Sequence, residues 1–276
     1  MAIKIWYQSM SRQTVWSSYS DYLKKILDQV KDPDTEIEVH GITKVGGVAP
    51  QYRYLEFLET GEVMENCHQA LERKFDAFLI GNIIDPGLRE CREIANIPVL
   101  GLCETTCHVA CMSGASFSLV TINEKFTPRV IENVVRYGLR DRLVAVNRMK
   151  LDRIADIDHA FNDPTARASA IEQFQAAAKA NTDAGAEVVI AAGGVPMALL
   201  AYAGVHTTPS GAPILNGITT LVKMGEAAVK LDRIMGGNFT SKRLHYKPPG
   251  PEQIAEIRKH YGANIYPTVG LPQAKA

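Results

Sequence analysis

The sequence lacks the features that mark several broad classes of protein. No apolar run approaches the roughly 20 residues that a membrane-spanning helix needs, and Met1 to Lys4 lead into a strand-like run rather than a signal peptide. The 30 basic and 30 acidic residues balance, without a basic block that would favour nucleic acid. Five cysteines without paired spacing are typical of reduced cytosolic thiols. We therefore expect a soluble, cytoplasmic protein that binds neither nucleic acid nor a membrane.

Motifs of cofactor-binding and hydrolytic enzymes are also missing. Neither Gly46-Gly47 nor Gly193-Gly194 has the spacing of a dinucleotide-binding loop or of a P-loop. The chain contains no Gly-x-Ser-x-Gly nucleophile elbow. The sequence therefore indicates no nicotinamide cofactor, and we expect no other cofactor.

Strand and helix patterns alternate along the first half of the chain. Short apolar or alternating runs predict strands, and longer stretches of helical periodicity lie between them. This order is typical of a parallel sheet with helices on both faces. The predicted strands are residues 3–7, 36–40, 77–80 and 98–100, and the clearest helices are about 14–30 and 52–73.

The second half repeats this order. Predicted strands at 117–121, 143–146 and 188–190 correspond to those of the first half, and IPVLG at 97–101 is matched by APILN at 212–216. We therefore predict an α/β fold of two similar lobes that face each other across a ligand cleft. The predicted division is 1–115 plus about 217–245, then 116–216, then an extension at 246–276 that packs on a neighbouring lobe or subunit.

Four stretches carry a resemblance to a known family. They are DAFLIGNIIDPGLRECREIANIPVLGLCETTCHVA at 76–110, SFSLVT at 116–121, DAGAEVVIAAGG at 183–194 and APILNGITTLVKMGEAAVKL at 212–231. The chain resembles the aspartate/glutamate/hydantoin racemase superfamily, most closely its hydantoin and allantoin racemase branch. The resemblance implies a small-molecule substrate and a homo-oligomer.

The family's two catalytic thiols are replaced in this chain. Such racemases use one thiolate as base and one thiol as acid, on opposite faces of the substrate carbon. The resemblance places the first thiol at the end of the strand that precedes DPGL, where this chain has Asn82, and the second at the end of the matching strand that begins with GAEVV, where this chain has Ala192. A carboxamide does not titrate, so Asn82 is expected either to hold a carbonyl or carboxylate or to cap the next turn. Ala192 with Gly193 and Gly194 is expected to leave room and N–H groups for an anion or a larger substrate.

Other titratable groups follow the fourth predicted strand. Cys103 and Glu104 are expected to face the cleft, and His108 lies four residues after Glu104, on the same helical face. These three residues are the catalytic candidates. Packing in the core is the alternative for the cysteines and capping or lobe packing for Glu104. Glu104 and His108 supply too few ligands for a metal site, so no metal is predicted.

Polar side chains also follow other predicted strands. Ser11, Thr121 and Asn123 are among them, and the resemblance implies that such loops hold the polar groups of a substrate. The same residues would also serve as helix caps. The predicted substrate-binding residues are Gln8, Ser9, Asn82, Ile83, Thr121, Ala192, Gly193 and Gly194.

Five further residues are weaker candidates. Tyr7 and His206 lie near predicted strand ends. Tyr52 and Tyr54 follow a glycine-containing loop that either closes over the cleft or packs on the surface. Asp85, just before Pro86, is interpreted as a turn residue.

The sequence leaves two classes of function open. The first is an enzyme that acts next to a carbonyl or carboxylate of a small acid or cyclic amide, as an isomerase or racemase with a replaced base or as a lyase or hydrolase. The second is a non-catalytic binding or regulatory protein on the same fold, which the loss of both thiols favours. A retained cleft with titratable neighbours favours the enzyme.

Overall fold

The computed structural model of the chain describes residues 2–48, 52–151 and 155–267. The first lobe is built on a parallel sheet with the strand order β2-β1-β3-β4. Its strands are β1 (Ile3–Gln8), β2 (Thr35–His40), β3 (Ala77–Ile80) and β4 (Val99–Gly101). Its helices are α1 (Ser17–Val30), α2 (Arg53–Glu72), α3 (Leu88–Ile94) and α4 (Leu102–Ser113).

The second lobe has the equivalent strand order, β6-β5-β7-β8. Its strands are β5 (Phe117–Thr121), β6 (Leu143–Arg148), β7 (Val188–Ala191) and β8 (Ile214–Leu215). Its helices are α5 (Thr127–Arg136), α6 (Ala155–His159), α7 (Pro164–Asp183) and α8 (Gly194–Tyr202), and a short 3-10 turn, η1, spans Arg140–Arg142. Two four-stranded parallel sheets flanked by helices confirm the predicted two-lobe α/β fold.

The central strands β3 and β7 are covered on both faces. Every residue of β3 and of β7 is buried, as expected for parallel strands between two helical layers. In β1 the two faces differ. Trp6 packs with the α2 side, whereas Tyr7 belongs to the cluster that continues into the second lobe.

The chain returns to the first lobe through α9 (Gly217–Ile234). The side chain of Asn216 caps this helix by accepting hydrogen bonds from the N–H groups of Ile218 (3.0 Å) and Thr219 (3.3 Å). Gly225 of α9 lies against Leu79 of β3, where a Cβ atom would be 2.8 Å from the leucine Cδ1. The boundaries of the two lobes and of the C-terminal extension that the sequence predicts remain a prediction.

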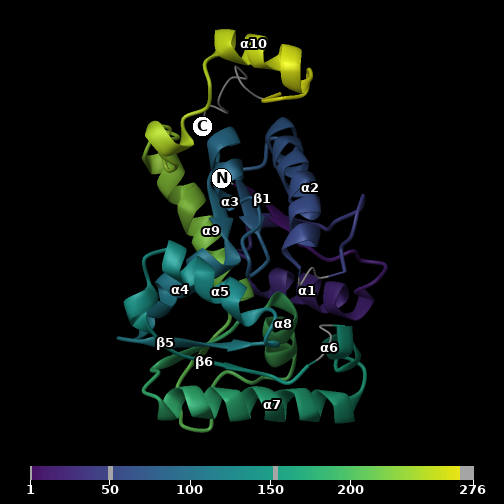
Figure 1. Cartoon of the computed structure of the whole chain (residues 1–276), viewed down its shortest axis with the longest axis vertical. Helices are drawn as coiled ribbons and strands as arrows, with labels where there is room; N and C mark the ends of the chain where they lie inside the picture. Colours follow the sequence, from purple (N-terminus) through teal and green to yellow (C-terminus); the bar gives the residue numbers. More distant parts are fainter. Residues whose placement is uncertain (1, 49–51, 152–154, 268–276) are drawn as a thin grey trace.

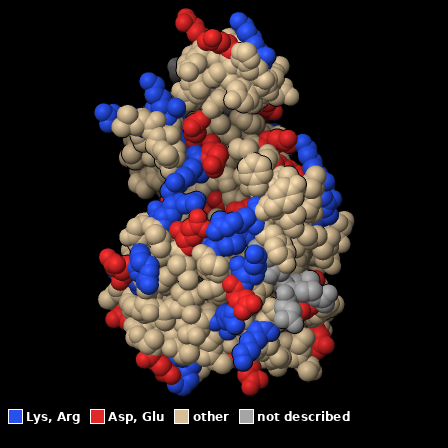
Figure 2. Space-filling view, viewed as in Figure 1, with Lys and Arg blue, Asp and Glu red and all other residues tan. Residues whose placement is uncertain are grey.

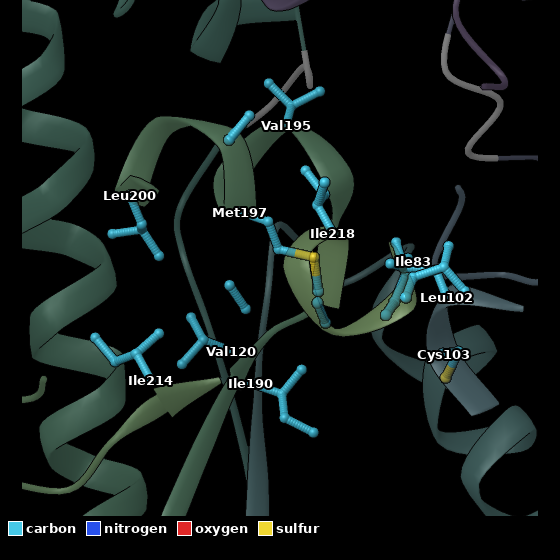
Figure 3. Packing of buried hydrophobic residues seen from close by; sticks show 14 of the residues in the cluster. Ile83, Leu102, Cys103, Val120, Ile190, Val195, Met197, Leu200, Ile214 and Ile218 are labelled. Carbon is cyan, nitrogen blue, oxygen red and sulfur yellow. The ribbon is translucent and has the colours of Figure 1, made fainter. Parts of the chain in front are cut away.

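One hydrophobic cluster runs through both lobes. It contains Leu79 of the first sheet and Ile190 of the second. Figure 3 shows Ile83 and Leu102 beside Ile218 and Met197 within this cluster. The two lobes are therefore packed together through an apolar core.

The C-terminal extension lies at the end of the first lobe that is far from the second sheet (Figure 1). It follows the 3-10 turn η2 (Leu244–Tyr246) and contains α10 (Pro251–Tyr261). Its Tyr266 hydroxyl donates to Glu93 Oε1 of α3 (2.5 Å). None of the helices in the described part of the chain is long and apolar enough to span a membrane.

Candidate active site between the two lobes

The carboxyl ends of the two central strands, β3 and β7, meet between the lobes. The Gly81 carbonyl oxygen lies 3.6 Å from the position that a Cβ atom on Gly194 would take, and the Tyr19 hydroxyl lies 2.8 Å from that position. We call this region the strand-end centre. It is formed by Tyr7, Ser9, Tyr19, Gly81, Asn82, Ala192 and Gly194.

Tyr7 is the least satisfied group of the strand-end centre. Its side chain is fully buried, and its ring lies so close to Gly81 that a Cβ atom there would be 2.3 Å from the ring Cζ. Within the described residues the Tyr7 hydroxyl has no hydrogen-bond partner. Burial raises the pKa of Tyr7 well above its ordinary value, so the hydroxyl stays protonated.

Tyr19 is the second buried phenol of the centre. It is 3% exposed, and burial raises the pKa of Tyr19. Its backbone N–H donates to Asp158 Oδ1 of the second lobe (2.9 Å). Tyr19 therefore joins α1 to the opposite lobe.

Asn82 adopts the turn-capping role that the sequence left open. Its Oδ1 accepts a hydrogen bond from the Ile84 N–H (3.0 Å). The Nδ2 group is therefore the part of the side chain that is suited to donate to a ligand. Ile83, the next residue, is 1% exposed and belongs to the apolar core.

The loop after β7 has less room than its glycines suggest. The Ala192 N–H donates to the Val120 carbonyl (2.9 Å), and the Gly193 N–H donates to the Ala191 carbonyl (2.9 Å). The expectation of open N–H groups is therefore wrong at these two positions. Gly194 begins α8, and the first N–H groups of a helix have no partner within it.

Other predicted binding residues are engaged within their own lobes. Gln8 donates to the Ser9 carbonyl (3.0 Å) and accepts from Trp6 Nε1 (3.1 Å) and Asn66 Nδ2 (3.0 Å). The Thr121 hydroxyl lies 2.5 Å from that of Thr127. Neither side chain caps the helix that follows, so the capping alternative does not describe either residue.

Asn123 is also engaged within its own lobe, at the start of α5. Asn123 Oδ1 accepts from the Phe126 N–H (3.0 Å), and the Asn123 carbonyl accepts from the Thr127 hydroxyl (2.8 Å). These contacts hold the turn that leads into the helix. The loop after β5 is therefore shaped by its own hydrogen bonds.

Cys103 does not face the cleft, contrary to expectation. It is fully buried, with its Sγ 4.0 Å from Cys107 Sγ (Figure 3). The neighbouring Cys107 thiol, together with burial, raises the pKa of Cys103 well above its ordinary value. The nucleophilic thiolate form is therefore disfavoured.

Glu104 and His108 lie in a separate cavity of about 500 Å³ between α2, α3, α4 and α5. Arg92 pairs with Glu104 through both of its Nη atoms, one of them 3.0 Å from Oε1. His108 Nδ1 lies 2.8 Å from the Glu104 carbonyl oxygen rather than from its carboxylate. Among the described residues no three His, Cys, Asp or Glu side chains are grouped to hold a metal ion. We call this space the interlobe cavity.

Charged side chains of both signs line the interlobe cavity. Arg53 of α2 pairs with Glu132 of α5, and Arg129 of α5 pairs with Glu56 of α2. Figure 2 shows basic and acidic side chains gathered at the waist between the lobes. These ion pairs bridge the lobes on one side of the cleft.

Asp85 connects three parts of the structure. Its carboxylate accepts from the N–H groups of Cys103 (2.9 Å) and Glu104 (2.8 Å) and from the Tyr137 hydroxyl (2.6 Å). Asp85 thereby caps the start of α4 from outside that helix and joins the first lobe to Tyr137 of the second lobe. Burial raises its pKa to about 6. The sequence indicates this role of Asp85 only indirectly. The N-cap residue of α4 is Gly101, which has no side chain to cap the helix.

Of the weaker candidates, Tyr7 belongs to the strand-end centre, whereas Tyr52, Tyr54 and His206 lie away from it. Tyr52 and Tyr54 are 57% and 71% exposed. The preceding loop is held by Gly47, whose N–H donates to Glu59 Oε1 (3.0 Å), whereas residues 49–51 lie outside the described ranges. His206 accepts through its carbonyl from the Ile214 N–H at the start of β8. This is the opposite end of the sheet from the centre.

The pH dependence of stability is expected to report the buried Asp85. Its folded-state pKa is raised from the ordinary 3.8 to about 6, so the folded protein binds this proton more tightly than the unfolded chain. The resulting stabilisation is present below about pH 4 and is lost as the pH rises through about 6, a change of about 3 kcal/mol.

Denaturant unfolding of the wild type and of Asp85→Asn between these pH values measures this effect. As the pH rises, the free energy of unfolding of the wild type should fall relative to that of Asp85→Asn. Parallel pH profiles for the two proteins would contradict the assignment.

Sequence relatives and similar structures agree with this architecture. The chain is 28% identical over 231 residues to the hydantoin racemase of Pseudomonas sp. (strain NS671), which covers 84% of this chain and 87% of that protein. It is 28% identical to the hydantoin racemase of Paenarthrobacter aurescens, over 72% of this chain and 78% of that protein.

Among solved structures, two allantoin racemases share the fold. The enzyme from Klebsiella pneumoniae has a TM-score of 0.73 at 22% identity and covers 90% of this chain and 94% of its own. The enzyme from Pseudomonas fluorescens has a TM-score of 0.73 at 23% identity and covers 90% and 98%. The sequence model of the Asp/Glu/Hydantoin racemase family matches residues 15–225. The chain therefore belongs to the Asp/Glu/hydantoin racemase family.

Proposed function

We propose that the protein is an isomerase of the racemase type that acts on a carbon next to a carbonyl group. The substrate class is a small cyclic amide or a small acid, bound at the strand-end centre. Family membership and the two hydantoin racemase relatives support this class. A 5-substituted hydantoin is a cyclic amide in which a carbonyl group lies beside the stereogenic carbon.

The observation that carries the proposal is the buried Tyr7 hydroxyl. Leaving a buried hydroxyl unbonded costs about 1–3 kcal/mol, and such a group in a native protein points to a missing partner. The Tyr7 hydroxyl is fully buried and has no partner among the described residues. A carbonyl oxygen of a substrate would supply that partner.

Proton removal beside a carbonyl places negative charge on the carbonyl oxygen. A hydrogen bond from a fixed donor in a dry site becomes stronger as that charge develops. Tyr7 is suited to this role because burial keeps it protonated. Asn82 Nδ2 and the N–H groups at the start of α8 are the further donors of the centre.

Proton transfer in this proposal does not use thiols. Asn82 and Ala192 occupy both thiol positions, and Cys103 is buried in the core. Tyr19, whose hydroxyl lies 2.8 Å from the position of a Cβ atom on Gly194, is a further group of the centre that carries an exchangeable proton. The relatives give no support to a lyase, a hydrolase or a non-catalytic binding protein.

The interlobe cavity is a second location for the same chemistry. Its volume of about 500 Å³ falls in the range of small-molecule sites. Glu104, His108 and Asp85 line it, and a carboxyl group with a pKa of about 6 is suited to a general base. In this arrangement Asp85 would have to release one of its present hydrogen bonds.

An α-proton exchange assay tests the proposal. The wild-type protein is incubated in D2O with 5-substituted hydantoins, allantoin, aspartate and glutamate, each as a single enantiomer. Loss of the α-proton signal by NMR together with loss of optical rotation is the expected result for at least one compound. Absence of both with every compound, in a protein shown to be folded, would contradict the proposed function.

We also propose that the chain forms a homo-oligomer, as the family resemblance implies. Tyr54 and Phe57 on α2 are 71% and 78% exposed, and neighbouring exposed apolar side chains mark interaction surfaces. Light scattering after size exclusion is expected to give a multiple of the chain mass. A monomer mass at micromolar concentration would contradict this proposal.

A further inference from the structure

We propose that Asp158 of the second lobe is a positioning residue for the strand-end centre, because it caps α1 and thereby holds the Tyr19 hydroxyl beside the start of α8. The inference rests on the proposed function, since the position of Tyr19 matters for turnover only if a substrate reacts at the centre. It adds to that function a residue that acts from outside the centre, through one backbone hydrogen bond.

The helix α1 has no side-chain cap from its own N-cap residue. That residue is Trp16, whose side chain forms no capping hydrogen bond, and the first turn of α1 contains no acidic residue. The first N–H groups of a helix have no partner within it and need one from elsewhere. The start of α1 therefore depends on groups outside the helix.

Asp158 supplies a cap from the opposite lobe. Its Oδ1 accepts from the Tyr19 N–H (2.9 Å), although the two residues are 139 positions apart in the chain. Tyr19 follows Ser17 and Ser18 in the first turn of α1, where the side chain of a capping residue usually accepts its hydrogen bond. A carboxylate at the amino end of a helix also interacts favourably with the helix dipole. Asp158 thus caps α1 across the boundary between the lobes.

The residue that Asp158 caps is also the one that reaches the strand-end centre. The Tyr19 hydroxyl lies 2.8 Å from the position that a Cβ atom on Gly194 would take, and the Gly81 carbonyl oxygen lies 3.6 Å from the same position. The Tyr19 side chain is buried. A displacement of the first turn of α1 would therefore move this hydroxyl at the point where the carboxyl ends of β3 and β7 meet.

The segment that carries Asp158 is held against α1 by two further contacts. Figure 1 shows α6 next to α1 and α8, where the two lobes meet. Asn162 Nδ2 donates to Ser18 Oγ (2.8 Å), and the buried Phe161 ring stacks on the Tyr22 ring, with the ring centroids 5.0 Å apart. These contacts do not involve the Asp158 carboxylate. Removal of that carboxylate should therefore uncap α1 without releasing the segment.

A purely structural role for Asp158 predicts a different pattern of effects. A cap that only stabilises α1 would lower the stability of the fold without changing the rate of the folded protein. A positioning residue acts through Tyr19, so its effect on the rate should disappear when the Tyr19 hydroxyl is absent. Its effect on stability should remain, because the capped N–H belongs to the backbone and is retained in Tyr19→Phe.

The test is a double-mutant cycle of Asp158→Ala and Tyr19→Phe in the full-length protein, with the compound that the wild type exchanges. We expect each single variant to lower kcat for α-proton exchange about 10- to 100-fold with a smaller change in KM, the scale expected for a misplaced group. The double variant should be no slower than Tyr19→Phe alone. In thermal unfolding, Asp158→Ala should lower the midpoint by roughly 2–4 °C both with and without the Tyr19 hydroxyl.

Two control variants separate the cap from the rest of the contact. Asp158→Asn keeps an oxygen acceptor, and asparagine caps helices about as well as aspartate, so this variant should retain most of the wild-type rate. Asn162→Ala removes the neighbouring hydrogen bond to Ser18 but leaves the Tyr19 N–H capped, and it should retain the wild-type rate as well. The Tyr19 amide proton should exchange with D2O faster in Asp158→Ala than in either control.

Three results would overturn the positioning role of Asp158. The first is a wild-type rate of substrate exchange in Asp158→Ala or in Tyr19→Phe. The second is a double variant in which the two losses of kcat multiply, and the third is a control variant as slow as Asp158→Ala. Each of these results leaves the proposed function in place, because the wild type still exchanges the compound. If the wild type exchanges no compound, the proposed function fails and the positioning role fails with it.

Discussion

Tyr7→Phe is expected to slow α-proton exchange about 100- to 1,000-fold, the usual cost of removing one donor that stabilises a developing oxyanion. The same substitution should leave the folded protein equally stable or about 1 kcal/mol more stable, because it removes a buried hydroxyl without a partner. The ring itself stays and continues to fill the space beside Gly81. Activity and stability should therefore change in opposite directions.

Tyr137→Phe is the matched control for this prediction. The Tyr137 hydroxyl donates to the Asp85 carboxylate (2.6 Å), and a hydrogen bond to a charged group contributes about 1.5–3 kcal/mol. This variant should lose stability, in contrast to Tyr7→Phe. Denaturant unfolding and NMR exchange measure both quantities. A Tyr7→Phe variant that is destabilised but exchanges normally would show that the hydroxyl is only structural.

Gly81→Ala is expected to destabilise the protein by about 3 kcal/mol or more and to abolish exchange. A Cβ atom there would lie 2.3 Å from the Tyr7 ring, and forcing extra atoms into a packed core typically costs about 1–3 kcal/mol and sometimes more. Tyr7 cannot move aside easily, because it is fully buried on a central strand. The substitution therefore damages the centre at its tightest contact.

Two further variants make this prediction specific. Gly61→Ala lies in α2 with no atom within 4 Å of the new Cβ, and it should stabilise the protein by about 0.5–1 kcal/mol. Tyr7→Leu/Gly81→Ala should recover much of the lost stability, since the smaller side chain removes the clash. Thermal and denaturant unfolding of the wild type, Gly81→Ala, Tyr7→Leu and the double variant measures the coupling, with Gly61→Ala as the control. A Gly81→Ala variant as stable as the wild type would contradict the described packing.

The sequence predicted the fold because its signals are local. Continuous apolar runs at Phe78–Ile80 and Val188–Ile190 mark strands that are buried on both faces, and the motif DPGL lies in its expected turn. The turn-capping alternative for Asn82 was also a local inference, and the Ile84 N–H contact agrees with it.

The strand-end centre could be predicted only in part. In the sequence, Tyr19 belongs to the buried positions of α1 together with Leu23, Ile26 and Leu27. Its hydroxyl therefore could not be recognised from the sequence as part of a site. In the interlobe cavity, the contact between Asp85 and Tyr137 spans 52 residues and depends on how the lobes pack. Sequence periodicity contains no information about such packing.

Cys103 shows how one residue at a boundary changes the interpretation. Its prediction as a cleft residue assumed that it directly follows a strand ending at Leu100. The structure extends β4 to Gly101 and begins α4 at Leu102, so Cys103 already lies in the first helical turn. Its side chain turns into the core, whereas the next residue, Glu104, turns towards Arg92.

The most direct test of the central claim is to measure α-proton exchange by the wild type, Tyr7→Phe and Glu104→Gln side by side. If the chemistry takes place at the strand-end centre, Tyr7→Phe loses about 100-fold or more, and Glu104→Gln keeps most of the wild-type rate. If Glu104→Gln loses exchange while Tyr7→Phe retains it, the reaction takes place in the interlobe cavity and the claim is contradicted.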